Sequence, residues 1–439
     1  MNNYSPLQIQ EILIKYLQPP AYDIVLSLEK STPSHIFDDK NKRFILDMFT
    51  FFGTMPLGMN HPKLNDEDFI RRLTKIAINK PSNTDFFTEA LAEFVETFEK
   101  IALPKFAKYL FFIEGGALAV ENALKIAFDW KVQKNFLKGY KEERGTQVIH
   151  FKEAFHGRTG YTLSLTNTDP VKIQYFPKFN WPRIINPKLR FPISEDELER
   201  VKKVEEEAIE QIKTAIYLNK DDIACLIIEP IQGEGGDNHF RKEFFLKLRE
   251  ICDENEILLI FDEVQTGIGL TGKMWAYEHF VEPDIIAFGK KLQVGGVIVN
   301  SRIDDIENNV FKKGGRINST WGGNLTDLFR AKRYLEVIEE ENLVSNAQFM
   351  GSYLLKELNK LQSEFPDIFS SARGSSLMCA IDLKDKATRD SFRKKLFENG
   401  LMILGCGEKS IRFRPRLSVT KEDIDEAMDI MKKSAMVIK

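Results

Sequence analysis

The feature that most constrains the fold lies between Leu258 and Gly296, where two short apolar runs each end in a charged residue. The first run reads L-L-I-F-D and ends at Asp262, and the second reads I-I-A-F-G-K and ends at Lys290. Unbroken apolar runs of this length are typical of strands that are buried on both faces of a parallel sheet. Because open α/β sheets bind ligands at the carboxyl ends of such strands, we expect both charged residues at a functional edge.

A buried carboxylate and a buried amine on neighbouring strand ends can serve pyridoxal phosphate. The lysine would form a Schiff base with the aldehyde of the cofactor, and the aspartate would pair with the pyridinium nitrogen. Burial disfavours the charged ammonium and so helps to supply a nucleophilic amine at Lys290. Ion-pair networks at a sheet rim give the same pattern, so a purely structural pair of Asp262 and Lys290 remains an alternative.

The composition excludes several other classes of protein. A chain of 439 residues exceeds a single core and predicts two or three domains. The net charge of −3 gives no electrostatic footprint for nucleic acid, and no apolar run is long enough to span a membrane. The N-terminus lacks the pattern of a signal peptide, and the four cysteines form no C-x-x-C pair. We therefore expect a cytoplasmic protein without a structural metal site.

Strand-like and helical segments alternate along most of the chain, which is the pattern of an α/β fold. Further strands are expected at 24–26, 44–46, 108–113, 148–151, 224–228, 297–300, 377–383 and 410–413. Helices are expected at 5–17, 65–78, 87–103, 117–131, 194–217, 241–255, 387–398 and 421–437, with a long helical region between 324 and 365.

Three loops after strand candidates carry residues that could bind a ligand. Gly115 and Gly116 separate a strand from a helix, an arrangement that turns free backbone N–H groups towards a phosphate but also occurs in turns that bind nothing. Phe155 could stack on a cofactor ring and Arg158 could hold a carboxylate, although loop residues of both types often serve packing. Glu234 stands among glycines, which predicts a tightly turning, flexible loop beside the site.

The segment Gly267 to Gly272 reads G-I-G-L-T-G and matches the dinucleotide fingerprint G-x-G-x-x-G. In that fingerprint the glycines follow the strand directly. Here five residues, Asp262 to Thr266, stand between the apolar run and the first glycine. The sequence therefore does not favour nicotinamide or flavin binding.

Taken in order, the motifs G-G-A, F-H-G-R, E-P-I-Q-G-E-G-G, F-D-E-V-Q-T-G, F-G-K, N-S-T and R-F-R-P resemble the class III (ω-) aminotransferases, which use pyridoxal phosphate and have fold type I. Phrases such as G-E-G-G-D-N-H-F and N-S-T-W-G-G-N-L-T-D resemble the lysine 6-aminotransferase branch. The likeness covers nearly the whole chain from about Phe44. It implies a large domain of residues 62–322 around a mostly parallel sheet, with a small α/β domain built from residues 1–61 and 323–439.

The resemblance also implies which residues hold the cofactor. Lys290 corresponds to the Schiff-base lysine, although Lys291 beside it is an alternative. Asp262 corresponds to the partner of the pyridinium nitrogen, Gln265 to the ligand of the ring 3-oxygen, and Phe155 to the aromatic side chain on the ring. The phosphate cradle corresponds to Gly116 and Ala117, and phosphate ligands from the second subunit of a homodimer correspond to Ser319 and Thr320.

The substrate side of the site follows from the same resemblance. Arg412 is similar to the arginine that binds the α-carboxylate of a 2-oxo acid, with Arg416 as a neighbouring alternative, and Arg158 to the arginine at the far carboxylate. Glu234 is similar to the catalytic glutamate that covers Arg412 when a terminal amine is donated. With L-lysine as the donor and 2-oxoglutarate as the acceptor, the products would be L-glutamate and 2-aminoadipate 6-semialdehyde, which cyclises to piperideine-6-carboxylate.

Two alternatives to this reaction remain at the level of sequence. The donor could be ornithine, 4-aminobutyrate or acetylornithine, because the same set of residues serves all terminal amines. The chain could also be a folded dimer that binds the cofactor without turnover.

Overall fold

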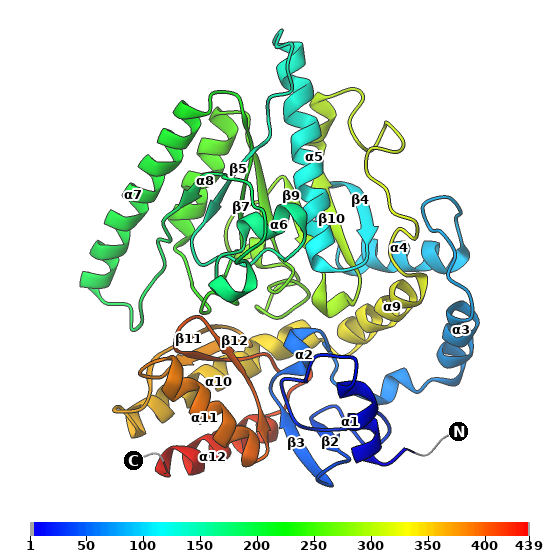
Figure 1. Cartoon of the computed structure of the whole chain (residues 1–439), viewed down its shortest axis with the longest axis vertical. Coiled ribbons are helices and arrows are strands. Elements are labelled where there is room, and N and C mark those ends of the chain that lie inside the picture. Colours follow the sequence, from blue (N-terminus) through cyan, green and yellow to red (C-terminus); the bar gives the residue numbers. More distant parts are fainter. Residues whose placement is uncertain (1–3, 438–439) are drawn as a thin grey trace.

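The computed structural model describes residues 4–437, and Figure 1 shows one large sheet above two smaller sheets. Within the described residues the large sheet has seven strands, in the order β4 (Ala107–Ile113), β10 (Gly295–Asn300), β9 (Ile285–Phe288), β8 (Leu258–Asp262), β7 (Ile223–Ile228), β5 (Gln147–Phe151) and β6 (Arg183–Ile184). Strand β10 is antiparallel to both of its neighbours, and all other pairs are parallel. The expectation of a mostly parallel sheet is confirmed.

Helices cover both faces of this sheet because its central strands are apolar on both sides. Every residue of β7, β8 and β9 is buried. Along β8, Ile260 packs in a cluster with α5 (Gly116–Leu137), whereas Leu259 and Phe261 pack with α7 (Glu195–Leu218) and α8 (Lys242–Glu254). This alternation follows from the two-residue period of a strand.

The two ends of the chain meet in the smaller sheets. One contains β1 (Leu26–Ser27), β2 (His35–Asp38), β3 (Arg43–Asp47) and β13 (Leu401–Met402), where β13 runs parallel to β3. The other contains β11 (Ser370–Ser375), β12 (Met378–Asp382), β15 (Ser410–Phe413) and β14 (Leu404–Cys406). N-terminal and C-terminal segments thus share one sheet, while the expected boundaries after residues 61 and 322 stay a prediction.

The remaining helices surround these sheets (Figure 1). They are α1 (Pro6–Ile14), α2 (Thr50–Gly53), α3 (Glu67–Ala77), α4 (Glu89–Ile101), α6 (Gly160–Leu165), α9 (Leu325–Glu340), α10 (Leu343–Glu364), α11 (Lys386–Glu398) and α12 (Lys421–Met436). The long helical region expected between 324 and 365 is divided, because Asn342 adopts a left-handed conformation between α9 and α10. Among residues 4–437, no helix has both the length and the apolar content that crossing a membrane requires.

Candidate active site

Asp262 and Lys290 lie at the carboxyl ends of two neighbouring parallel strands. Asp262 is the last residue of β8, and Lys290 follows β9 after Gly289. Lys290 has a positive φ of 43°, which is strained for a residue with a side chain and occurs at functional sites. Burial and the charge of Arg412 lower the pKa of Lys290, against the opposing effect of nearby carboxylates, which include Asp262 and Glu234.

The partner of Asp262 is a histidine rather than the lysine. Nδ1 of His156 donates a hydrogen bond to Oδ2 of Asp262 at 2.8 Å, and both side chains are buried. The backbone N–H of Val264 donates to the other carboxylate oxygen at 3.0 Å. No ion pair joins Asp262 and Lys290 within residues 4–437, so the structure gives no support to the alternative of a purely structural pair between them.

A second buried carboxylate, which sequence reasoning missed, lies next to this pair. Glu229 follows β7, and its carboxylate accepts hydrogen bonds from the backbone N–H groups of Phe155 at 2.9 Å and Gly233 at 3.1 Å. Burial raises the pKa of Glu229 to about 7, and the charge of Asp262 adds to the effect, although His156 opposes it. The sequence signal that could have identified Glu229 is its place directly after the apolar run that forms β7, next to β8.

The glycines at the start of α5 bring the backbone of three segments together. A Cβ at Gly116 would lie 2.7 Å from a methyl group of Val264, and a Cβ at Gly289 would lie 3.1 Å from Cα of Gly116. Gly115 precedes α5 with a φ of 90°, and no side chain caps the helix. The first N–H groups of α5, which include those of Gly116 and Ala117, therefore have no partner within the helix and can receive an anion.

Gln265 belongs to a buried network that joins the site to the C-terminal part of the chain. Its side-chain oxygen accepts hydrogen bonds from Arg412 at 3.1 Å and from Arg414 at 2.7 and 2.9 Å. Arg414 also forms a two-pronged ion pair with Asp237, and neither side chain is exposed. With its oxygen engaged by two guanidinium groups, Gln265 has its amide nitrogen left to donate.

The contacts of Lys290 and Lys291 differ, and so do those of Arg412 and Arg416, which distinguishes the two candidates in each pair. The amine of Lys291 donates to the backbone carbonyl of Gln265 at 2.7 Å and is buried, whereas the amine of Lys290 makes no hydrogen bond or ion pair with any described residue. Arg416 pairs with Asp423 at 2.8 Å, away from the strand ends. The geometry therefore favours Lys290 over Lys291 and Arg412 over Arg416, and both assignments stay predictions.

Glu234 connects two cations. One carboxylate oxygen accepts from Arg412 and the other from Lys172, each at 2.5 Å. Burial raises the pKa of Glu234, but the charges of Arg412 and Lys172 outweigh it and hold that pKa below its usual value. Sequence reasoning did not identify Lys172, which stands in a polar loop without a motif.

The loop around Glu234 turns tightly, and its glycines pack closely against neighbouring segments. A Cβ at Gly233 would lie 2.2 Å from the side-chain oxygen of Gln265, and one at Gly235 would lie 2.1 Å from the carbonyl of Glu153. The carbonyl of Glu234 also accepts from the N–H of Gly407 at 2.9 Å. The glycines are required for close packing, so any motion here belongs to the side chain of Glu234.

The other candidates lie at the surface of the single chain. Phe155 is half-buried, and the amine of Lys172 lies 5.3 Å from the centre of its ring. Arg158 is exposed and makes no hydrogen bond or ion pair with the described residues. Thr320 is exposed, and Ser319 accepts a hydrogen bond from the N–H of Gly322 at 2.9 Å. In the single chain, these side chains are accessible for contact with a ligand or a partner subunit.

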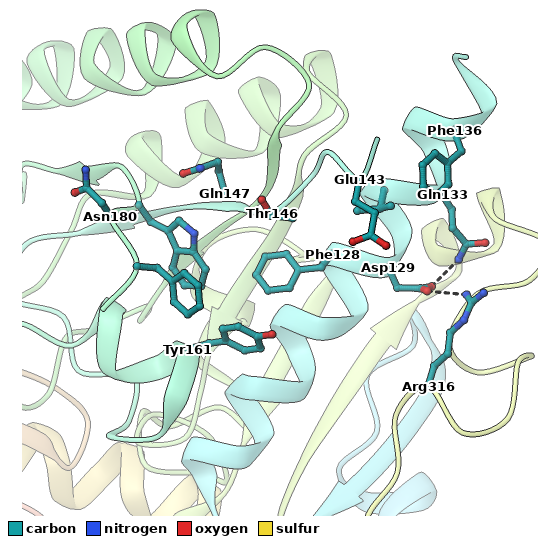
Figure 2. Close-up of a pocket in the computed structure, with 13 residues that line it drawn as sticks. Phe128, Asp129, Gln133, Phe136, Glu143, Thr146, Gln147, Tyr161, Asn180 and Arg316 are labelled. Atoms are coloured by element: carbon teal, nitrogen blue, oxygen red, sulfur yellow. Dashed lines mark hydrogen bonds and ion pairs between the residues drawn. The ribbon is translucent and has the colours of Figure 1, made fainter. Parts of the chain in front are cut away.

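A separate cavity of about 720 Å³ lies along the far turns of α5 (Figure 2). Figure 2 shows Phe128 of α5 beside Tyr161 of α6, whereas the side chain of Asp129 points away from Tyr161, towards Gln133 and Arg316. The carboxylate of Asp129 is already held by Arg316 at 2.6 Å and by Gln133 at 2.8 Å. None of the expected site residues lines this cavity, which is therefore distinct from the candidate active site.

The strand-end residues fit pyridoxal phosphate on the evidence of their own chemistry. The backbone at Gly116 lies so close to Gly289 and Val264 that a Cβ there would fill the space, which leaves a cradle for the phosphate. Beside it lies the amine of Lys290, whose pKa is lowered. The carboxylate of Asp262 is buried and held in place by His156. Together with the mostly parallel sheet, these features define an α/β enzyme of the pyridoxal phosphate class.

The family description Aminotransferase class-III matches residues 16–435, and the chain belongs to this family of pyridoxal phosphate enzymes. The L-lysine-epsilon aminotransferase of Mycobacterium tuberculosis (strain ATCC 25618 / H37Rv) is 48% identical over 436 residues, which cover 99% of this chain and 96% of that protein. The L-lysine-epsilon aminotransferase of Streptomyces clavuligerus is 42% identical over 100% of this chain and 96% of its own length.

A solved structure agrees with this relationship. The lysine aminotransferase of M. tuberculosis in the internal aldimine form superposes with a TM-score of 0.97 at 48% identity, covering 99% of this chain and 100% of the other. The class III aminotransferase fold expected from the sequence is confirmed.

Proposed function

We propose that this aminotransferase moves the terminal amine of L-lysine to 2-oxoglutarate, giving L-glutamate and 2-aminoadipate 6-semialdehyde, which cyclises to piperideine-6-carboxylate. The pairing of Glu234 with Arg412 carries the proposal. It neutralises the arginine beside Lys290, so a donor with an uncharged chain next to its amine can enter without leaving a buried charge unpaired. Full-length similarity to L-lysine-epsilon aminotransferases supports lysine as that donor.

Pyridoxal phosphate, when bound, supplies an aldehyde for the donated amine and a ring that stabilises the charge left when the adjacent C–H bond breaks. Lys290 is placed to move that proton, because its amine is unpaired and its pKa is lowered. Asp262, oriented by His156, would hold the ring nitrogen in its protonated form. The amide nitrogen of Gln265 would donate to the ring oxygen, and the N–H groups at Gly116 and Ala117 would hold the phosphate.

The same site must accept both a terminal amine and an α-amino acid. Lysine places its α-carboxylate far from the reacting carbon, where Arg158 would bind it. Glutamate places its α-carboxylate next to the reacting carbon, where Arg412 would bind it. Glu234 would cover Arg412 in the first case and move aside in the second, by rotation of its side chain because its backbone is tightly packed.

A homodimer with a shared phosphate site is part of the proposal. Exposed aromatic residues stand in the loop that carries Ser319 and Thr320 and in the segment of residues 83–87, which contacts that loop. Trp321 is 40% exposed, and Phe86 and Phe87 are 69% and 96% exposed. The segment that carries Phe86 and Phe87 is joined to this loop by the N–H of Asn83, which donates to the carbonyl of Trp321. Exposed apolar side chains that cluster in this way are typical of subunit interfaces.

We also infer a cytoplasmic location. Within residues 4–437 the four cysteines are buried and form no disulfide, which is the usual state in a reducing compartment.

The proposed reaction is tested with a panel of donors and one acceptor. Purified holoenzyme is supplied with 2-oxoglutarate and, separately, with lysine, ornithine, 4-aminobutyrate or acetylornithine, and glutamate formation is measured together with the mass of the second product. We expect kcat/KM for lysine to exceed that for the others by at least about tenfold, a difference of about 1.4 kcal/mol. A better donor among the other three would replace lysine, and inactivity with all four would favour the inactive dimer.

A further inference from the structure

The carboxylate of Glu234 is shared between two cations that come from distant parts of the chain. Arg412 is enclosed, with 4% of its side chain exposed, whereas Lys172 lies nearer the surface at 24%. Each cation engages a different carboxylate oxygen. Glu234 can therefore leave Arg412 without giving up its contact with Lys172.

Lys172 is held in place by its own surroundings. It ends a short 3₁₀ helix, Pro170–Lys172, in the connection between α6 and β6. Its amine also donates to the hydroxyl of Thr168 at 3.4 Å and lies over the ring of Phe155. These contacts fix a positive charge on the outer side of Glu234.

A cavity of about 100 Å³ opens beside Glu234 on this outer side. Besides Lys172, it is lined by three cationic residues, Lys386, Arg389 and Arg393 of α11, and by the carboxylate of Asp169. Lys386 lies 3.9 Å from Asp169, and Arg389 and Arg393 are partly neutralised by Asp390. A water molecule occupies about 30 Å³ in the liquid, so the cavity has room for a carboxylate group.

We propose that Lys172 is a positioning residue for Glu234, which it retains at the mouth of this cavity when an α-carboxylate takes Arg412. The inference rests on the proposed switch of Glu234 and adds the place to which its carboxylate moves. Without Lys172, an incoming α-carboxylate would have to displace the carboxylate of Glu234 from Arg412, its one remaining side-chain partner among the described residues. With Lys172 present, the incoming α-carboxylate replaces only the ion pair between Glu234 and Arg412, and the ion pair between Glu234 and Lys172 is kept.

This arrangement makes Lys172 a determinant of substrate preference. Removing its charge leaves Glu234 with Arg412 as its single partner, which favours the covered arginine. Binding of glutamate and 2-oxoglutarate should weaken, because both must uncover Arg412. Binding of lysine should change little, because it uses the covered state.

The test compares Lys172→Met with Lys172→Arg and with Lys178→Met as a matched control. Lys178 lies on the same loop, where its amine donates to the carbonyls of Ile173 and Phe176 and does not touch Glu234. Calorimetry measures 2-oxoglutarate binding to the holoenzyme in its aldehyde form, where no turnover follows, and single-turnover spectra measure the lysine and glutamate half-reactions. We expect Lys172→Met to weaken 2-oxoglutarate and glutamate about tenfold, with Lys172→Arg near the wild type.

A double-mutant cycle with Glu234→Ala shows whether Lys172 acts through Glu234. We expect Lys172→Met to have no selective effect on glutamate once Glu234 is absent. Equal weakening of lysine and glutamate, or an undiminished effect on glutamate in the Glu234→Ala background, would overturn the inference. If Glu234→Ala alone leaves the ratio of lysine to glutamate unchanged, the proposed switch itself fails. If that ratio changes while Lys172→Met has no effect, only the role of Lys172 fails.

Discussion

His156 donates a hydrogen bond through Nδ1 to the carboxylate of Asp262 at 2.8 Å, and both side chains are buried at the strand ends of the large sheet. The contact joins residues 106 positions apart and fixes the orientation of the carboxylate. Nε2 of His156 has no hydrogen-bond partner among the described residues. The pair therefore presents a negative charge in a fixed direction beside Lys290.

Replacing His156 should change how strongly the cofactor stabilises the fold. His156→Phe fills the same space but leaves the buried carboxylate of Asp262 without its side-chain donor, which costs about 1–3 kcal/mol. We expect a smaller rise in Tm when pyridoxal phosphate is added, because Asp262 is no longer oriented. His279→Phe, which loses a hydrogen bond to the carbonyl of Thr271, is the control and should keep the full rise. Equal rises in both variants would count against an orienting role.

The choice between adjacent lysines is tested by a matched pair of variants. Lys290→Met should abolish the linkage to pyridoxal phosphate that borohydride traps and lower kcat by about 10²–10⁴-fold. Lys291→Met should keep the linkage, because the amine of Lys291 is occupied by the carbonyl of Gln265. Mass spectrometry of the reduced protein identifies the modified peptide in each case. A trapped linkage in Lys290→Met would reverse the assignment.

The phosphate cradle makes a steric prediction. In Gly116→Ala the new Cβ would lie 2.7 Å from a methyl group of Val264, so α5 or Val264 must shift and the N–H groups must move with it. We expect cofactor affinity to fall about tenfold, measured by absorbance titration of the apoprotein. Gly314→Ala is the control, since a Cβ at Gly314 meets no atom within 4 Å. An unchanged affinity in Gly116→Ala would show that this cradle does not hold the phosphate.

The proposed interface makes a prediction about assembly. Phe87→Glu places a charge on a residue that is 96% exposed, in the segment whose Asn83 and Thr84 contact the loop of Ser319 and Thr320, so it should break the dimer. Phe349→Glu makes the same change on α10, where the side chain is 71% exposed, and should leave the dimer intact. Sedimentation velocity at assay concentration measures both. A fully active monomer of the wild-type protein would falsify the shared site.

The sequence predicts those parts of the molecule that depend on local pattern. The apolar runs that end at Asp262 and Lys290 identify two adjacent buried strands, and a single strand order then brings both residues to one edge. Contacts between distant segments carry no such local signal. Glu234 and Arg412 are 178 positions apart, and only the resemblance to a family suggested their pairing. Lys172 had neither a motif nor a family role, so the folded chain was required to find it.

Short and irregular elements were the other part that sequence could not supply. Strand β6 has two residues, and α6 has six, so neither extends far enough to show a period. The glycines around Glu234 predicted a tight turn, but not that Gly233 and Gly235 pack closely against Gln265 and Glu153. Sequence shows which residues are small but not what is packed against them.

The buried carboxyl of Glu229 gives the last prediction, which concerns pH. Its folded-state pKa is about 7, above the usual 4.5, because burial disfavours the charged form. A group of this kind contributes its full stability below its unfolded pKa and loses it as the pH rises through the folded pKa. The wild type should therefore lose stability relative to Glu229→Gln, whose amide stays neutral, between about pH 4.5 and 7. The amide keeps one acceptor oxygen for Phe155 or Gly233, and the loss of the other hydrogen bond is a constant offset that does not change with pH. At about 1.4 kcal/mol per pH unit the difference approaches about 3 kcal/mol above pH 7. Urea unfolding of the two apoproteins at several pH values measures it, and a difference that is constant from pH 4.5 to 8 would show that Glu229 does not titrate in this window.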